Sequence, residues 1–285
     1  MSWRQITLEV PDDLKDAVIG ELSDDGVAGV WEETVSSNST RIAAYLSDDS
    51  HFEDLEGRIR TIFTRMAREA PSISIEHFEE RDWTEEWRKS YTSFPIGDDF
   101  FVIPSWETSQ CPEDRLPIRI DPGQAFGTGT HETTQLTMEA LERWVEPRHV
   151  VLDVGAGSAI LAIASRLLGA KQVIACDIDP VAVQVAISNI QRNGERGDIL
   201  PFCGSVDAIA GVSVDLLLAN LTADVIIELF PEFQRVLKPR GLAIFSGILN
   251  EQREDIANAC DKFGFRIHED SIRGEWLVVI AEYGA

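Results

Sequence analysis

Cysteine is scarce in this sequence, and none of it has the spacing of metal ligands. The 285 residues include four cysteines, and no two of them form a Cys-x-x-Cys pair: Cys111, Cys176, Cys203 and Cys260. Cys176 and Cys203 stand in apolar runs, so we interpret the cysteines as buried, reduced thiols rather than as a disulfide framework. The sequence also has no His-x-x-x-His pair and no cluster of histidine with acidic residues, which argues against a metal site.

Long hydrophobic runs are absent as well. No apolar run reaches the length of a membrane span, although 44% of the residues are hydrophobic. The first residues, Met1 to Arg4, lack the basic-then-apolar pattern of a secretory signal. We therefore expect a cytoplasmic protein that does not bind membranes and that has enough apolar residues for one large domain or two.

Positive charge is the third shortage. The chain has 25 Lys and Arg residues against 49 Asp and Glu, a net charge of −24, and only five of the basic residues are lysine. Such a surface repels phosphate backbones, and no basic run interrupts it, so direct tight binding to nucleic acid is not expected. High acidity with little lysine fits adaptation to salt and also fits a GC-rich genome, and composition does not separate the two.

Residues 1–80 have the pattern of a small separate domain. Alternating apolar residues and turn signals predict strands over residues 3–10, 26–31, 41–46 and 73–78, with helices over residues 11–24 and 52–69. In the second helix, five apolar residues share one face: Leu55, Ile59, Ile62, Phe63 and Met66. The order βαββαβ predicts a ferredoxin-like α+β domain, which by itself says little about function.

A linker helix over residues 81–93 is expected to lead into a second domain, residues 94–285. Its first strands are predicted over residues 94–104 and 116–120. From Val150 onward strands and helices alternate, which predicts a mostly parallel sheet covered on both faces. The expected strands are 150–154, 173–177, 199–203, 214–219, 241–247, 264–269 and 275–282, and the expected helices are 158–168, 180–193, 223–236 and 251–262. The last two strands are too close for a crossover, so they should form an antiparallel hairpin.

The most informative stretch is an apolar run that ends in an acid and is followed by a glycine turn. The run from Val150 reaches Asp153, and Gly155 and Gly157 follow before a helix begins. A glycine turn at a strand end lets a ligand approach the backbone, because no Cβ stands in the way. Asp177 ends the next strand, 22 residues after Gly155. A carboxylate there can accept hydrogen bonds from both hydroxyls of a ribose, so this order predicts a nucleoside-cofactor site.

The third small position of the turn is Ala159, where glycine is commoner. Alanine allows close helix–strand packing but not a positive φ, so we expect the turn to form with slightly less room at the ligand. A dehydrogenase fingerprint would need a third glycine at the start of the helix, and the residues there, up to Leu161 six residues after Gly155, include none. This argues against a dinucleotide-binding dehydrogenase.

A glycine- and threonine-rich loop precedes this turn, with the sequence DPGQAFGTGTHETT over residues 121–134. We expect Thr133 or Thr134 to cap the helix that follows, and His131 is the one histidine in a suggestive context. The loop has two interpretations: an ordinary N-cap loop, or a lid over the amino-acid end of a cofactor, with Phe126 shielding the reaction from water. It lacks the Gly-Lys-Ser/Thr ending of a phosphate-binding P-loop.

Asn220 ends the apolar strand run over residues 214–219. Open α/β sheets bind ligands at the carboxyl ends of their strands, and an amide there offers both a donor and an acceptor. The alternative is an ordinary strand cap. No Gly-x-Ser-x-Gly elbow is present, so a serine hydrolase is not expected.

Together these stretches resemble one family, the ribosomal protein L-eleven lysine methyltransferases (PrmA) of the class I S-adenosylmethionine enzymes. The loop DPGQAFGTGTHETT is the most specific match. The other matches follow in family order: VLDVGAGSAILAIA, DIDPVAV, ANLTADV, SGIL and GEW, with DWTEEWRKSY in the linker. The resemblance covers nearly the whole chain, and the departures are Ala159 and the strong acidity.

The resemblance implies a class I methyltransferase fold, a mostly parallel, Rossmann-like sheet of seven strands with an antiparallel last strand. It implies S-adenosylmethionine as cofactor and a large-subunit ribosomal protein as substrate, which the N-terminal domain recognises. The targets are lysine side-chain amines, with the N-terminal amine as a further candidate. Asp177 would hold the ribose and Thr134 the amino-acid end, while Asn220 would be catalytic, beside the sulfonium and the incoming amine. The candidate cofactor-binding residues are Phe126, Thr134, Asp153, Gly155, Gly157, Asp177, Ile178 and Asn220.

Apart from a dehydrogenase, two alternatives to this ribosomal protein methyltransferase hypothesis remain. The first keeps the enzyme class and changes the substrate to RNA, a small molecule or another protein. Methylation of glutamine or adenine usually carries Asn-Pro-Pro-Tyr or Asp-Pro-Pro-Tyr at the end of the fourth strand, and the sequence after Ala219 does not match it. The second is a binding module that keeps the fold without catalysis. We expect a monomer, and the sequence does not set the number of methyl groups added.

Overall fold

The computed structural model describes residues 2–24, 29–36, 39–47, 52–66, 68, 71–79, 91–121, 127–194 and 197–284. The chain divides into two compact units, Met1–Tyr91 and Thr92–Ala285, and each is described here by itself. Residues 80–90, which include most of the predicted linker helix, lie outside the described residues.

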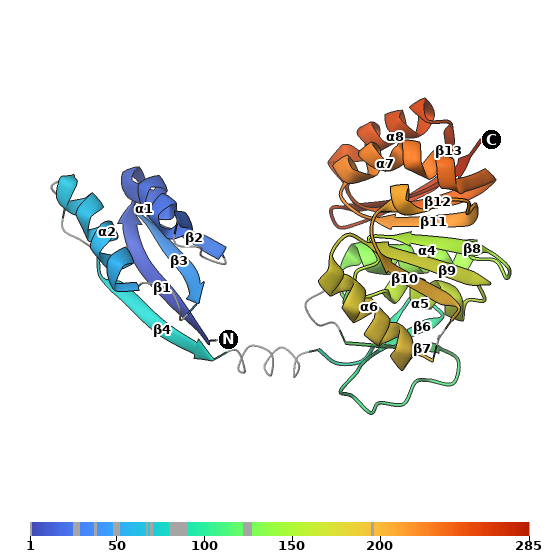
Figure 1. Ribbon diagram of the computed structural model, residues 1–285, viewed down its shortest axis with the longest axis horizontal. Helices are drawn as coiled ribbons and strands as arrows, with labels where there is room; N and C mark the ends of the chain where they lie inside the picture. Colours follow the sequence, from blue (N-terminus) through green and yellow to red (C-terminus); the bar gives the residue numbers. More distant parts are fainter. Residues whose placement is uncertain are drawn as a thin grey trace. The chain divides into compact units, whose positions relative to one another are not determined.

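The first unit is a four-stranded antiparallel sheet with two helices (Figure 1). Its elements are β1 Ser2–Pro11, α1 Asp12–Asp24, β2 Gly29–Ser36, β3 Ser39–Ser47, α2 Phe52–Arg65 and β4 Ile73–Glu79. The strand order is β2-β3-β1-β4, and every neighbouring pair is antiparallel. This confirms the predicted ferredoxin-like order.

Alternation along β1 forms the core of this unit. Ile6, Leu8 and Val10 are buried on one face and pack with apolar residues of both helices. Helix α2 ends earlier than predicted, at Arg65, and Met66 is therefore 59% exposed rather than part of the buried face.

The second unit is built on a seven-stranded sheet with the order β10-β9-β8-β11-β12-β14-β13. Its strands are β8 Val150–Val154, β9 Gln172–Asp177, β10 Ile199–Cys203, β11 Val214–Asn220, β12 Leu237–Leu249, β13 Phe265–Arg273 and β14 Trp276–Tyr283. Strand β14 runs antiparallel to both of its neighbours, whereas the pairs from β10 to β12 are parallel. The predicted parallel sheet and its antiparallel hairpin are confirmed.

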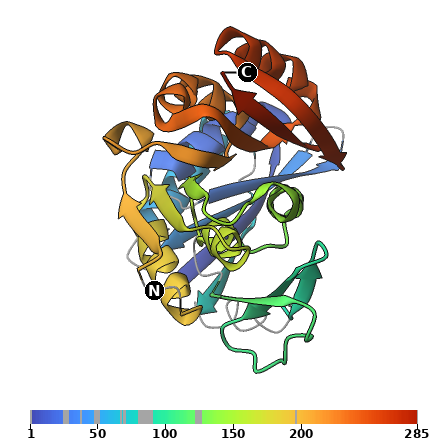
Figure 2. The same ribbon diagram turned by 90° about the vertical axis from the view of Figure 1, so that its right-hand side faces the viewer.

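A separate three-stranded sheet precedes this one. It consists of β5 Phe94–Ile96, β6 Phe100–Pro104 and β7 Leu116–Ile120. The single strand expected over residues 94–104 is thus two antiparallel strands, because the turn at Gly97 (φ +55°) reverses the chain. The two views place this small sheet at one end of the unit and α8 with β13 at the other (Figures 1 and 2).

The helices cover both faces of the large sheet. They are α4 Glu132–Trp144, α5 Ile160–Leu167, α6 Pro180–Arg192, α7 Ala223–Val236 and α8 Arg253–Lys262, with short 3₁₀ turns at Val206–Ala208 and Asn250–Gln252. Helices α4, α5 and α6 share one apolar cluster with the sheet, and α7 and α8 share the other. Because successive strand residues point to opposite faces, Val151 belongs to the first cluster and Leu152 to the second.

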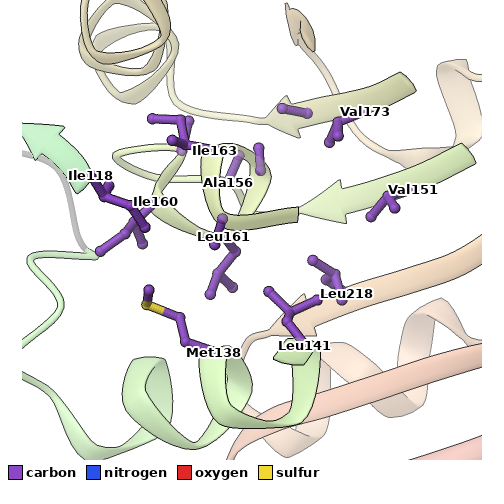
Figure 3. Close-up of a cluster of buried hydrophobic side chains, with 14 of the residues drawn as sticks. Ile118, Met138, Leu141, Val151, Ala156, Ile160, Leu161, Ile163, Val173 and Leu218 are labelled. Atoms are coloured by element: carbon purple, nitrogen blue, oxygen red, sulfur yellow. The ribbon is translucent and has the colours of Figure 1, made fainter. Parts of the chain in front are cut away.

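The first cluster joins the sheet to α4 and α5 (Figure 3). Met138 and Leu141 of α4 point toward Leu161 of α5 and toward Val151 and Leu218 of the sheet. All five side chains are at most 5% exposed. Apolar burial of this kind holds the carboxyl ends of the strands in fixed relation to the helices that follow them.

The cysteines only partly follow the expectation from sequence. Cys176 and Cys260 are buried, and burial raises the pKa of both thiols to about 12. Cys203 is exposed instead, because it ends β10 at the edge strand of the sheet, and Cys111 is half-buried. The four thiols are unpaired, as predicted.

Ala159 departs from the expected backbone conformation. Its φ is +64° and its ψ is +21°, the left-handed region that the sequence analysis excluded for alanine. The residue stands immediately before α5 and is fully buried, so packing against the sheet imposes a conformation that costs an alanine about 1 kcal/mol.

We predict that Ala159→Val lowers the free energy of unfolding by more than about 2 kcal/mol, because a β-branched side chain resists a positive φ and the site has no spare room. Ala164→Val is the matched control, since it adds the same volume at a fully buried position inside α5. Urea unfolding of both variants measures the difference. An equal loss in the control would assign the cost to overpacking rather than to the backbone.

Candidate functional site

A cavity of about 630 Å³ opens at the carboxyl ends of the parallel strands. The loops after β8, β9, β10 and β11 all contribute to its lining: Gly155, Gly157, Asp177, Ile178, Asp179, Gly204, Ser205, Asn220, Leu221 and Thr222. The remaining walls come from the start of α4, from α6 and α7, and from Gly247 and Trp276. Parallel strands bring their carboxyl ends to one edge, so residues far apart in the sequence meet in this strand-end cavity.

The glycine turn is held to the next strand by its own backbone. The amides of Gly155 and Ala156 both donate to the carbonyl oxygen of Cys176, at 2.9 and 3.0 Å. Gly155 has a φ of +70°, and a Cβ at this residue would stand 2.5 Å from the Leu221 side chain. Glycine is therefore required twice, for the backbone conformation and for the close approach of β11.

Asp177 joins the turn to the start of α6. Its Oδ2 accepts the Gly157 amide and its Oδ1 accepts the Asp179 amide, both at 2.9 Å. A carboxylate has about four lone-pair sites, so two acceptor positions remain for a ligand in the cavity. Ile178 beside it is 77% exposed and lines the same cavity, where it offers an apolar surface.

Asp153 and Thr134 are buried rather than part of the cavity lining. Both are fully buried, and neither the Asp153 carboxylate oxygens nor the Thr134 hydroxyl makes a side-chain hydrogen bond of good geometry with the residues that the structure describes. Burial raises the pKa of Asp153 to about 7, the Ala162 amide favours its charged form, and Asp177 disfavours it. Phe126 lies outside the described residues.

His131, not Thr133 or Thr134, caps helix α4. Its Nδ1 accepts the Thr133 amide at 3.3 Å and lies 2.8 Å from the Thr133 hydroxyl. The imidazole then meets the Trp276 ring edge to face, with centroids 4.9 Å apart. The predicted threonine cap is wrong because both threonines lie inside the helix, whereas His131 stands directly before it, at the non-helical position whose side chain can turn back to the first free amides.

Asn220 ends β11 and lines the same cavity as this aromatic pair. The amide of Leu221 donates to Ser246 of β12 at 3.0 Å, which fixes the loop after Asn220. Gly247 has a φ of +79°, and a Cβ there would overlap the Leu221 carbonyl. The wall around Asn220 therefore depends on a second obligatory glycine.

A family model described as "Ribosomal protein L11 methyltransferase (PrmA)" matches residues 3–283 of the chain. The chain belongs to the PrmA family. Relatives with the same name include proteins from Caldicellulosiruptor bescii, 33% identical over 99% of both chains, and from Pelotomaculum thermopropionicum, 33% identical over 100% of both. A crystal structure of ribosomal protein L11 methylase from Lactobacillus delbrueckii subsp. bulgaricus is 35% identical, covers 68% of this chain and all of its own, and has a TM-score of 0.64.

The PrmA match and the sheet topology together confirm the predicted class I methyltransferase fold. Of the eight candidate cofactor-binding residues, the structure brings five to the cavity lining: Gly155, Gly157, Asp177, Ile178 and Asn220. Thr134 directly follows the lining residue Thr133, and Asp153 lies two residues before Gly155. Their cofactor roles stay predictions.

Several lining residues were missed by reasoning from the sequence. Trp276 and Gly247 belong to matched family motifs, GEW and SGIL, but no role was inferred for them. Val225, Glu228 and Leu229 line the cavity from the first two turns of α7. Their spacing of three and four residues places them on one helix face directly after Asn220, which is the signal that could have found them.

Within the described part of the chain, no helix is both long and apolar enough to cross a membrane. In the same residues, no three His, Cys, Asp or Glu side chains gather as metal ligands would.

We predict that Asp153 makes the protein less stable as the pH rises from about 4 to about 7. Its pKa is higher in the folded than in the unfolded chain, so the folded state holds a proton that the unfolded chain has released. A rise from 3.8 to about 7 corresponds to a loss of at most about 4 kcal/mol above this window. Asp153→Asn removes the titrating group and should remove this loss.

Thermal unfolding of the wild type and Asp153→Asn across this pH window tests the prediction. The difference in Tm between the two proteins should grow in favour of the variant as the pH rises. A constant difference would mean that Asp153 titrates at its ordinary pKa.

Proposed function

We propose that this protein transfers methyl groups from S-adenosylmethionine to lysine side-chain amines of a large-subunit ribosomal protein, with the N-terminal amine as a further target. The observation that carries the proposal is the strand-end cavity, in which Gly155, Asp177 and Asn220 line one space at the ends of three adjacent strands. Family membership supports the same reaction, because the relatives are named for methylation of ribosomal protein L11.

The residues present fit a nucleoside with an amino-acid tail. Asp177 keeps acceptor positions for the two ribose hydroxyls, and Ile178 presents an apolar face for the base. The backbone of Gly155 and Gly157 lines the cavity and would face the tail. Among the described residues, the Thr134 hydroxyl and the Asp153 carboxylate make no side-chain hydrogen bond of good geometry. They lie close in sequence to this end, and we assign them to the amino-acid group.

S-adenosylmethionine supplies an electrophilic methyl group on a sulfonium, a good leaving group. The protein must therefore align a nitrogen lone pair with that methyl group and hold the amine neutral. A free lysine amine has a pKa near 10.4 and is mostly protonated at neutral pH. The amide oxygen of half-buried Asn220 can accept a hydrogen bond from one N–H of the neutral amine, and the Leu221 carbonyl is suited to accept a second. The displaced proton leaves to water, with no dedicated base.

The side of the cavity beyond Asn220 is suited to the incoming lysine. His131, whose Nδ1 is engaged as a cap acceptor, and Trp276 form an aromatic wall there. The net charge of −24 attracts a lysine-rich partner by long-range electrostatics and disfavours nucleic acid. We assign recognition of the partner to the first unit, and we expect a cytoplasmic monomer.

Asn220→Ala should lower kcat by about 100-fold while leaving the Kd for S-adenosylhomocysteine within about threefold, because the amide acts on the amine rather than on the nucleoside. Radiolabelled methyl transfer to the ribosomal protein and calorimetric titration measure the two quantities. Equal losses in both would remove Asn220 from the catalytic role.

Asp177→Ala should weaken cofactor binding and leave kcat nearly unchanged, the opposite of the result expected for Asn220→Ala. Loss of two charge-assisted hydrogen bonds to a ribose weakens binding by about 100-fold, with kcat at saturating cofactor little changed. Asp207→Ala, which removes an exposed acid in the turn Val206–Ala208, controls for the loss of charge alone. Comparable weakening in both variants would point to general electrostatics.

The proposed reaction as a whole is tested by mass spectrometry of the ribosomal protein after incubation with the enzyme and S-adenosylmethionine. Added methyl groups on lysine are expected. A wild-type protein that is stabilised by NAD but not by S-adenosylhomocysteine in thermal unfolding would contradict the proposal.

A further inference from the structure

Two asparagines one turn apart, Asn189 of α6 and Asn193 directly after the helix, hold the backbone around the end of β7. Asn189 Oδ1 accepts the Asp121 amide at 2.8 Å, and its Nδ2 donates to the Asp121 carbonyl at 3.1 Å. Asn193 makes the same pair of bonds with Arg119, at 2.8 and 2.7 Å. Each amide side chain thus pairs with the backbone much as a neighbouring strand would.

The two asparagines differ in the further hydrogen bond that each side-chain amide donates. Asn189 Nδ2 also donates to the Ser158 carbonyl at 3.1 Å, whereas Asn193 Nδ2 donates to the Asn189 carbonyl. The Arg192 guanidinium adds a bond to Asn189 Oδ1 at 3.2 Å. Asn189 is therefore linked to the glycine turn, since Ser158 directly follows Gly157.

Ser158 continues this connection on its other side. Its hydroxyl donates to the Gly127 carbonyl at 2.6 Å and accepts the Ile160 amide at 3.3 Å. Both Ser158 and Asn189 are fully buried. We call this pair the Asn189–Ser158 hub. Through its hydrogen bonds, this hub connects Asp121 and Gly127 to each other beside the glycine turn. In the sequence, these two residues flank residues 122–126 of the loop.

The chain from Gly127 onward lies close against the turn. Gly127 has a φ of +98°, and a Cβ there would stand 2.8 Å from Ser158 Oγ. Gly129 has a φ of +84°, and a Cβ there would stand 3.1 Å from the Ile160 side chain. Two residues later, His131 caps α4 and lines the cavity. The hub therefore sets where the His131 wall stands relative to the glycine turn.

We propose that Asn189 and Ser158 are positioning residues for cofactor binding. They hold the stretch from Gly127 to His131 and the Gly155–Gly157 turn in one arrangement around the same cavity. This inference rests on the proposed function, because the ligand concerned is the methyl donor. A buried polar network gives one arrangement when it is complete, and its loss lowers the fraction of molecules that are competent to bind. The measured Kd then rises in inverse proportion to that fraction.

Asn189→Ala and its matched control Asn193→Ala separate positioning from stability. Each removes one asparagine that pairs with the β7 region, so both should lower Tm by a similar amount. Asn189→Ala should weaken binding of S-adenosylhomocysteine about tenfold in calorimetric titration, and Asn193→Ala less than twofold. In methyl transfer, Asn189→Ala should raise KM for S-adenosylmethionine by the same factor, with kcat recovered at saturation.

Ser158→Ala provides a second route to the same result. It removes the hydroxyl alone, is expected to weaken binding about tenfold, and carries the test if Asn189→Ala does not fold. Because both residues act on one stretch of chain, the double variant should lose less affinity than the product of the two single losses.

Unchanged S-adenosylhomocysteine affinity in Asn189→Ala and Ser158→Ala would overturn the inference. An equal weakening in Asn193→Ala would overturn it too, because a general loss of stability would then explain the effect. A wild-type protein that does not bind S-adenosylhomocysteine would instead overturn the proposed function, so the two failures are distinguishable.

Discussion

A single backbone oxygen holds the glycine turn after β8 to the end of β9. The Cys176 carbonyl accepts the amides of Gly155 and Ala156, and the next residue, Asp177, accepts the amide of Gly157. The turn after β8 is therefore hydrogen-bonded to the end of β9 at three consecutive positions. Because these bonds involve buried backbone groups, a displaced turn would leave several of them unsatisfied, which is costly.

Leu221 extends this constraint to β11 and β12. A Cβ at Gly155 would meet its side chain, and a Cβ at Gly247 would overlap its carbonyl. Three strand ends therefore approach one residue, and glycine at two of them makes the approach possible. Asn220 precedes Leu221, so its position in the cavity follows from backbone contacts rather than from its own side-chain bonds.

Burial of polar groups behind the cavity has two different consequences. Asn189 and Ser158 are buried with their hydrogen bonds made, which favours one arrangement of the surrounding chain. Asp153 is buried without comparable partners among the described residues, and its raised pKa shows the cost of charging it there. A class I methyltransferase fold thus combines a rigid polar connection with one destabilising acid directly before its glycine turn.

Local patterns in the sequence predicted the elements because hydrophobic periodicity is a local property. The order βαββαβ, the strand that ends in Asp177 and the antiparallel hairpin followed from it, and family motifs identified the enzyme class. The errors occur where a neighbour distant in sequence decides the outcome. Ala159 takes a positive φ because packing imposes it, and Cys203 is exposed because its strand is at the sheet edge. The cap at His131 is an error of another kind, because its contact with Thr133 is local.

The sequence by itself determined which residues can serve a nucleoside: the glycines that free the backbone, the acid 22 residues later and the amide at a strand end. The tertiary structure alone decided that these residues line one cavity, that Trp276 and α7 complete its walls, and that Asn189 of α6 reaches Ser158. The physical reason is that spacing along a chain records local conformation. Which strand ends meet, and which buried amide finds a partner, depends on how the sheet and its helices pack.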